Sequence, residues 1–258
     1  VGALILFLRF LPEFGLRKAA IWGVFHSISA FCNAGFDIFG CIAPGQSVIT
    51  FNHDPVIMLT LAALVILSSL GFFVWEDVAT KRSWKKLSVY TKLVLLTTLT
   101  LVLGGALIMG VLEWNNPATI GNMPVWQKVL NSFFQSVTLR TAGFSGVDQA
   151  GLTDAGKLVS MVLMFIGGSS GSTAGGVKTV TMVVLLLFVW NRMRGKETVC
   201  VFKRTIPKDK VMDAMTIVAI VLVLALAGGC FICAVSGFSI ADAMYETVSA
   251  LATVGLSS

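Results

Sequence analysis

Long apolar runs constrain this chain more than any other feature of its sequence. Residues 55–75, 92–112 and 213–236 are three such runs, and 156–190 is a fourth that glycines interrupt. A helix of about 20 apolar residues crosses a hydrocarbon core roughly 30 Å thick. Charged residues make up only 12% of the chain, against about 25% in an ordinary soluble domain. We therefore predict an all-α polytopic membrane protein, and we exclude soluble globular, disordered and disulfide-stapled chains.

Basic residues are concentrated in two stretches between these runs. Residues 76–92 contain five basic and two acidic residues, and 191–210 contain seven basic and two acidic residues. The segments on the opposite side of the runs hold six basic and eight acidic residues. Lys and Arg accumulate in cytoplasmic loops. We therefore predict cytoplasmic hairpins at 76–91 and 191–210, a multi-pass location in the cytoplasmic membrane, and no nucleic-acid partner.

Three further apolar segments are too short to cross a bilayer. Residues 18–31, 125–138 and 240–252 would rise only about 18–21 Å as helices, well short of roughly 30 Å. Segments of this length are typical of re-entrant half-helices or of helices buried in a protein core. Each is followed by a turn of small residues that contains one glycine.

These three turns are copies of one pattern. A small or polar residue, a small apolar residue, a glycine and a large apolar residue follow one another in each, and the glycines are 108 and 112 residues apart. We name them glycine loop one (Asn33, Ala34, Gly35), glycine loop two (Thr141, Ala142, Gly143) and glycine loop three (Thr253, Val254, Gly255). One copy alone would indicate a tight turn, whereas three copies in register indicate a repeat with a shared role.

The order of segments predicts how the repeats are related. Two membrane crossings separate successive glycine loops, so all three loops lie on one side, opposite the basic hairpins, and the repeats are parallel. Backbone that leaves a helix at membrane depth has carbonyls that need partners, and a ring of carbonyls can replace the hydration shell of a cation. The glycine loops are therefore the candidate ion filter.

The interruption of the fourth run is a second candidate site. Five glycines in ten residues disfavour a helix, by about 1 kcal/mol each relative to alanine. We predict a movable intramembrane loop below the filter that acts as a gate and has few backbone hydrogen bonds to lose. The alternative is close helix packing through Gly171 and Gly175. This Gly-rich segment comprises Gly167, Gly168, Ser169, Ser170, Gly171, Ser172, Thr173, Ala174, Gly175, Gly176, Val177 and Lys178.

Two cations lie within these candidate sites. Arg140, three residues before Gly143, either braces filter-loop carbonyls from behind or faces the ion path, and we favour the brace because an exposed guanidinium would oppose cation binding. Lys178 is an intramembrane charge, which is functional by default. It would either repel the ion or pair with a regulatory partner. No pattern of metal ligands or of a nucleophile with its base is present in the sequence, so we predict no enzyme.

The three glycine loops, S-I-S-A-F-C-N-A-G-F-D, Q-S-V-T-L-R-T-A-G-F-S and E-T-V-S-A-L-A-T-V-G-L-S, resemble those of the Trk/Ktr/HKT superfamily of potassium transporters, most closely the bacterial Ktr-type membrane subunit. The resemblance implies four M1-P-M2 units around one pseudo-four-fold pore, with one filter glycine per loop. Repeat two would occupy 1–75, repeat three 92–190 and repeat four 211–258, with repeat one and the last helix absent. The resemblance also implies a homodimer and a cytosolic nucleotide-binding regulatory subunit.

We therefore predict uptake of K+ through a carbonyl-lined filter, with K+ as the only metal, held at the filter, and with no covalent cofactor. Because each loop has a single glycine, fewer carbonyls can face the ion, and we expect weaker rejection of Na+. Whether Na+ assists uptake stays open. The alternative is a secondary carrier for another cation or solute, which parallel repeats disfavour.

Overall fold

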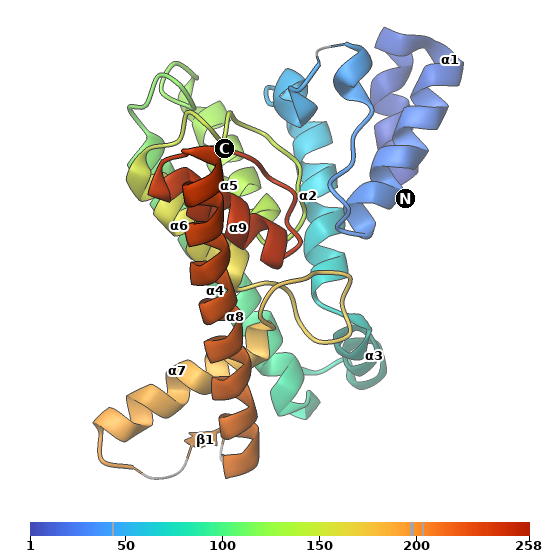
Figure 1. Cartoon of the computed structure of the whole chain (residues 1–258). Helices are drawn as coiled ribbons and strands as arrows, with labels where there is room; N and C mark the ends of the chain where they lie inside the picture. Colours follow the sequence, from blue (N-terminus) through green and yellow to red (C-terminus); the bar gives the residue numbers. More distant parts are fainter. Residues whose placement is uncertain (43, 197–198, 203) are drawn as a thin grey trace.

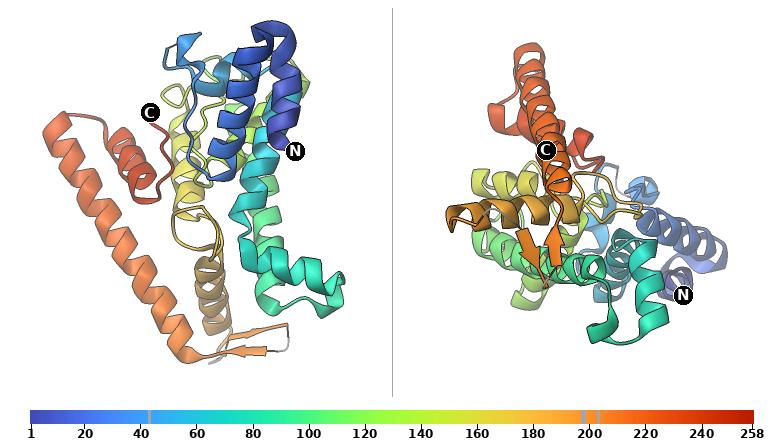
Figure 2. Two further views of the ribbon diagram at one scale, coloured as in Figure 1. Left: turned by 90° about the vertical axis from the view of Figure 1, so that its right-hand side faces the viewer. Right: turned by 90° about the horizontal axis from the view of Figure 1, so that it is seen from below.

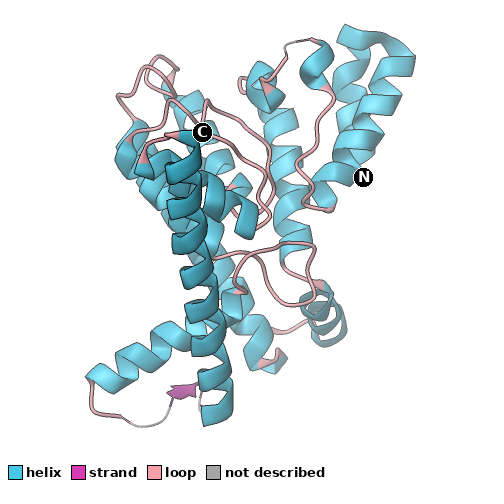
Figure 3. Cartoon of the chain, in the orientation of Figure 1, coloured by secondary structure: helices cyan, strands magenta, loops and turns pink. Residues whose placement is uncertain are grey.

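The computed structural model describes residues 1–42, 44–196, 199–202 and 204–258. Its helices confirm the predicted helical architecture (Figures 1 and 3). The α-helices are α1 (Gly2–Phe31), α2 (Pro55–Ser69), α3 (Phe72–Lys81), α4 (Val89–Glu113), α5 (Val125–Thr138), α6 (Asp154–Phe165), α7 (Thr179–Met193), α8 (Lys208–Ser236) and α9 (Ile240–Leu251). Short 3₁₀ turns are η1 (Phe39–Cys41), η2 (Ser47–Phe51) and η3 (Trp84–Lys86).

One small sheet departs from the all-helical expectation. Strands β1 (Val199–Val201) and β2 (Arg204–Ile206) pair antiparallel between α7 and α8. They lie within the predicted hairpin 191–210, of which residues 197, 198 and 203 are outside the described residues. This hairpin lies at the same end of the molecule as α3, and the loops that follow α4 and α5 lie at the opposite end (Figure 1).

The first helix is two antiparallel halves. Gly15 has φ 72° and ψ 169°, which reverses the chain within the span assigned to α1. Such a positive φ is accessible to glycine at little cost. The halves then pack closely, because a Cβ built on Gly23 would lie 2.8 Å from the backbone nitrogen of Phe7. The second half supplies the predicted short segment that leads into glycine loop one.

The predicted span 55–75 is wrong in its second part. Helix α2 ends at Ser69, and α3 leaves it at an angle of 88°. The bend is at Gly71, which has φ 81°. The backbone groups freed there are paired with the Gly-rich segment: the backbone N–H of Ser169 donates to Ser69 O at 3.0 Å, and the N–H of Phe72 donates to Gly171 O at 3.0 Å. Contacts between segments distant in sequence therefore stabilise the bend.

The remaining runs form as expected. By length and composition, α4 and α8 could each cross a bilayer, and α2 with α3 would be a third crossing if counted as one bent span. Helix α8 extends along one side of the molecule, and α9 turns back against it (Figure 2). Their packing is close at Gly228, where a Cβ would lie 2.6 Å from the methyl group of Thr247.

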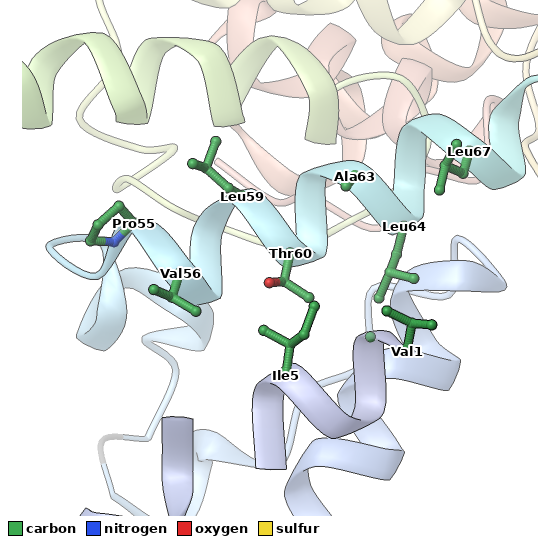
Figure 4. A pocket seen from close by; sticks show the side chains of 10 residues that line it. Val1, Ile5, Pro55, Val56, Leu59, Thr60, Ala63, Leu64 and Leu67 are labelled. Carbon is green, nitrogen blue, oxygen red and sulfur yellow. The ribbon is translucent and has the colours of Figure 1, made fainter. Parts of the chain in front are cut away.

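A groove between the first half of α1 and α2 has a volume of about 400 Å³. Ile5, Leu59 and Leu64 are among the side chains that line it, and Thr60 contributes a hydroxyl (Figure 4). The described residues of its lining include no charged side chain. Its apolar lining suits contact with hydrocarbon rather than passage of an ion.

Asp77 joins α3 to the start of α4. Its carboxylate contacts Lys81 Nζ at 2.5 Å, and it accepts hydrogen bonds from Thr91 Oγ1 at 2.6 Å and from the backbone N–H of Ser88 at 2.8 Å. The bond from Lys81 and then those from Thr91 and Ser88 hold the pKa of Asp77 well below its usual value. This one carboxylate therefore joins the two ends of the basic hairpin 76–91.

Glu113, the last residue of α4, organises the opposite end of the molecule. Its side chain is buried, and both carboxylate oxygens accept hydrogen bonds. Thr153 donates to Oε1 through its hydroxyl at 2.6 Å and through its backbone N–H at 3.1 Å, and Oε2 accepts from Asn116 Nδ2 at 2.6 Å and from Thr119 Oγ1 at 2.9 Å. Thr153 is also the N-cap of α6, so Glu113 fixes how α6 enters the bundle.

We predict that Glu113→Gln lowers the stability of the folded protein. The new amide would place an N–H₂ group opposite a donor, which costs about 1–3 kcal/mol when buried. Glu76→Gln is the matched control, because Glu76 is exposed on α3. Thermal unfolding in detergent should give a lower midpoint for Glu113→Gln only. Equal midpoints for the two variants would contradict this role of Glu113.

Candidate functional site

The three glycine loops meet at one place. A Cβ built on Gly35 would lie 2.7 Å from Ala142 O and 2.7 Å from the Cα of Gly143. A Cβ on Gly143 would meet Val254 O and would lie 3.1 Å from the Cα of Gly35. Each of these glycines therefore faces the carbonyl that precedes the glycine of the next loop. The equivalent position of Gly255 has open space within 4 Å.

Backbone conformation repeats in the three loops. The first residue of each is left-handed although it is not glycine, with φ 51° at Asn33, 68° at Thr141 and 56° at Thr253. The glycine two positions later is left-handed too, with φ 70° at Gly35, 85° at Gly143 and 83° at Gly255. Left-handed residues at alternate positions turn successive carbonyls toward one side of a strand instead of alternating sides. Such a strand can present a row of oxygens to a cation.

A hydroxyl at the end of each half-helix holds the loop from behind. Ser29 Oγ donates to Phe36 O at 2.7 Å, Thr138 Oγ1 to Phe144 O at 2.7 Å, and Ser249 Oγ to Leu256 O at 2.6 Å. The acceptor is in each case the carbonyl of the residue after the glycine. These three residues were not predicted from the sequence, although each is a hydroxyl residue near the end of its short apolar segment.

The half-helices also point their C-terminal ends at the loops. The N–H of Ala34 donates to Ser29 O at 2.9 Å, and the N–H of Val254 donates to Ser249 O at 2.8 Å. In loop two, the N–H of Ala142 donates one residue closer, to Thr138 O at 2.9 Å. The C-terminal end of a helix carries partial negative charge. All three half-helices α1, α5 and α9 therefore favour a cation at the loops.

Glycine loop two lies between the other two. Thr141 and Ala142 are 1% and 0% exposed, and Gly143 is buried. Gly35 is half-buried and Gly255 is exposed, since each of these loops has a neighbour on one side. The described residues contain no group of three or more His, Cys, Asp or Glu side chains that could hold a metal.

The Gly-rich segment contacts all three glycine loops or the ends of their half-helices. The N–H of Gly175 donates to Thr141 Oγ1 at 3.1 Å, and Thr173 Oγ1 donates to Phe31 O at 3.2 Å. A Cβ on Gly175 would lie 2.5 Å from Ala252 O, so only glycine fits there without displacement. In Figure 1 this segment is the gold loop between α6 and α7, next to the lower end of α2.

The expectation that this segment has few hydrogen bonds is wrong. Its two ends are pinched together, with the N–H of Gly167 donating to Val177 O at 3.0 Å and the N–H of Val177 donating to Phe165 O at 3.0 Å. Tyr90, in the first turn of α4, donates its hydroxyl to Ser170 O at 2.9 Å. Together with the bonds to the bend after α2, these contacts hold the segment in place rather than leaving it loose.

Arg140 and Lys178 both donate hydrogen bonds to the Gly-rich segment. Arg140 is 2% exposed, and its Nη2 donates to Gly167 O at 3.3 Å and to Thr179 Oγ1 at 3.4 Å. These partners belong to the Gly-rich segment and to α7, whereas filter-loop carbonyls were expected, so Arg140 joins loop two to that segment. Lys178 is half-buried and donates to Ala174 O at 2.7 Å. It therefore ties the segment to itself.

Comparisons with known proteins match this arrangement. The TrkH family, described as a cation transport protein, matches residues 4–258. The chain is 38% identical to the Ktr system potassium uptake protein B of Vibrio alginolyticus and 36% identical to the potassium/sodium uptake protein NtpJ of Enterococcus hirae, over 99% of this chain and 56% of each relative. It thus spans a little over half the length of these curated relatives.

A solved structure shares the fold. The potassium transporter TrkH from Vibrio parahaemolyticus superposes with a TM-score of 0.73 at 18% identity, covering 98% of this chain and 60% of that protein. The resemblance predicted from the three glycine loops is confirmed by the family match and by the identity to both relatives. The chain belongs to the TrkH cation transport protein family.

Proposed function

We propose that the protein moves K+ into the cell through a filter formed by its glycine loops and by a fourth loop on the open side of Gly255. The observation that carries the proposal is the repeated backbone: three loops, each with two left-handed residues, lie around one point. The filter oxygens come from Asn33, Ala34 and Gly35 in loop one, Thr141, Ala142 and Gly143 in loop two, and Thr253, Val254 and Gly255 in loop three.

The physical sequence of transport follows from this geometry. An ion at the outer mouth exchanges water for carbonyl oxygens of the loops, and the hydroxyls of Ser29, Thr138 and Ser249 restrain each loop by bonding the carbonyl of the residue after its glycine. Since the three half-helices point their negative ends at the loops, they offset part of the cost of dehydration. The ion then meets the Gly-rich segment, which blocks the path until it moves. No chemical step takes place.

The names of relatives support the choice of ion, whereas the partners proposed below are those that the resemblance to the Ktr-type subunit implies. One relative is named for potassium uptake and another for potassium and sodium uptake. We assign K+ as the main ion and Na+ as a competitor, in keeping with one glycine per loop. The protein would lie in the cytoplasmic membrane as a homodimer, with a cytosolic nucleotide-binding subunit below the basic hairpins. A secondary carrier for another solute is the alternative, and a lack of K+ uptake would favour it.

The filter assignment predicts that Gly143→Ser, in the full-length protein, weakens K+ uptake. The side chain would meet Val254 O, and serine also disfavours the left-handed backbone at this position. We expect about a tenfold higher half-saturating K+ concentration, equivalent to roughly 1.4 kcal/mol. Gly45→Ser is the control, because Gly45 has φ 77° but open space around it. Wild-type K+ and Na+ kinetics in Gly143→Ser would contradict the filter.

The predicted orientation can be tested with single cysteines. A cysteine at Ser83 should resist an impermeant thiol reagent added outside cells, and one at Ala150 should react. Both positions are exposed. Ser83 follows α3, and Ala150 lies in the loop between α5 and α6 just before α6 begins; the ends of α3 and α6 concerned lie at opposite ends of the molecule. Native cysteines are replaced first. The control is labelling of both sites after the membrane is permeabilised. External labelling at Ser83 would place the filter on the wrong side.

The gate assignment predicts that loosening the Gly-rich segment raises the K+ flux. Shortening the segment should increase the flux most, and Tyr90→Phe should increase it less, because it removes only the hydrogen bond to Ser170 O. Lys178→Ala should act in the same direction by releasing Ala174 O. Flux per molecule is measured in vesicles, with Thr100→Val as a control whose hydroxyl bonds only within α4. Well-folded variants with unchanged or lower flux would show that the segment only packs helices.

A further inference from the structure

A buried glutamine outside the filter has an unusually complete set of partners. Gln149 lies six residues after Gly143 and is 3% exposed. Its Oε1 accepts hydrogen bonds from Gln135 Nε2 at 2.7 Å and from the hydroxyl of Tyr245 at 2.9 Å. Gln135 belongs to α5, the half-helix of loop two, and Tyr245 belongs to α9, the half-helix of loop three. One amide oxygen thus joins the half-helices of two repeats.

The amide nitrogen of Gln149 holds the strand that leaves glycine loop two. Nε2 donates to Val147 O at 2.8 Å and to Ser145 Oγ at 3.2 Å, and it lies 3.3 Å from Gln135 Oε1. Ser145 Oγ itself donates to Val147 O at 2.8 Å. Ser145 is only two residues after Gly143. Hydrogen bonds that fix residues 145–149 therefore also restrict the position of the filter glycine.

The same strand is held from its other side by the repeat that carries loop one. The N–H of Ser145 donates to Ser47 Oγ at 3.4 Å, and Asn52 Nδ2 donates to Gly146 O at 3.5 Å. Segment 145–149 is therefore hydrogen-bonded to both neighbouring repeats. Loop two is the one flanked on both sides, so the placement of this strand decides the spacing of loop two from loops one and three.

Burying the polar groups of this network costs free energy, which their hydrogen bonds must offset. Tyr245 and Gln135 are 0% and 3% exposed, and a buried amide or phenol costs free energy unless every group finds a partner. Satisfied polar networks confer a single rigid arrangement in return. Rigidity matters here because Na+ is smaller than K+. In the cavity-size account of selectivity, a ring of carbonyls that cannot close in around Na+ favours K+, and a ring that can close in does not.

We propose that Gln149 is a positioning residue that sets ion selectivity, by fixing the spacing of glycine loops two and three, and that Tyr245 transmits this restraint to loop three. The inference rests on the proposed function and adds to it the determinant of K+ preference over Na+. Gln149 touches no ion; it acts through Ser145 and Val147 on Gly143.

The test uses the full-length protein, in vesicles, with uptake of K+ measured against competing Na+. The variants are Gln149→Leu, Tyr245→Phe and the double variant. Gln149→Leu should lower the ratio of Na+ to K+ half-saturating concentrations about threefold to tenfold, the range expected for losing one or two neutral hydrogen bonds. Tyr245→Phe should lower it less. The double variant should match Gln149→Leu, because the hydroxyl acts only through the amide.

A control separates selectivity from stability. Thr98→Val removes another buried hydroxyl, on α4, that has no hydrogen-bond partner, and it should leave the ratio unchanged. An unchanged ratio in Tyr245→Phe and Gln149→Leu, with lower thermal midpoints, would overturn the inference and leave the network a purely stabilising role. If Gln149→Leu fails to reach the membrane, Tyr245→Phe decides alone. A wild-type protein that takes up no K+ would instead overturn the proposed function.

Discussion

Backbone groups that leave a helix at membrane depth must find partners within the protein, and this constraint explains most of the structure. The chain leaves helical geometry at three glycine loops, at Gly71 and in the Gly-rich segment. The breaks satisfy one another: Ser69 O and the N–H of Phe72 pair with the Gly-rich segment, and Thr141 Oγ1 accepts from that segment. The irregular regions therefore supply hydrogen-bond partners to one another.

Both neutral and charged side chains hold the glycine loops. The neutral ones are the hydroxyls of the half-helices, which bond the carbonyl after each glycine, and Gln149, which spans two repeats. The charged side chain of Arg140 reaches from loop two to Gly167 O, so it joins that loop to the Gly-rich segment. Glu246 also holds the segment after glycine loop three, because its Oε1 accepts from Ser257 Oγ and from the backbone N–H of Ser258, each at 2.7 Å.

The apolar pattern and the repeat predicted much of this. The short segment 125–138 coincides with α5, and the three glycine loops meet as their register implied. What escaped prediction depends on contacts between distant residues. One glycine in an apolar run did not reveal the bend at Gly71, because Ser169, a hundred residues on, stabilises it. The predicted partner of Arg140 was wrong for the same reason. The sequence did not distinguish Gln149 from other polar loop residues, because its hydrogen bond to Tyr245 joins distant positions.

The 88° bend between α2 and α3 connects the basic hairpin 76–91 to the Gly-rich segment. Helix α3 is ten residues long, about 15 Å, and it extends sideways from Gly71. Residues 169–171 are bonded to the base of this arm and to Tyr90, at the two ends of hairpin 76–91, whereas Thr173 and Gly175 are bonded to the filter side. A displacement of α3 would therefore reach residues 169–171 first, because these residues are bonded to its base, whereas Thr173 and Gly175 are bonded to Phe31 O and Thr141 Oγ1.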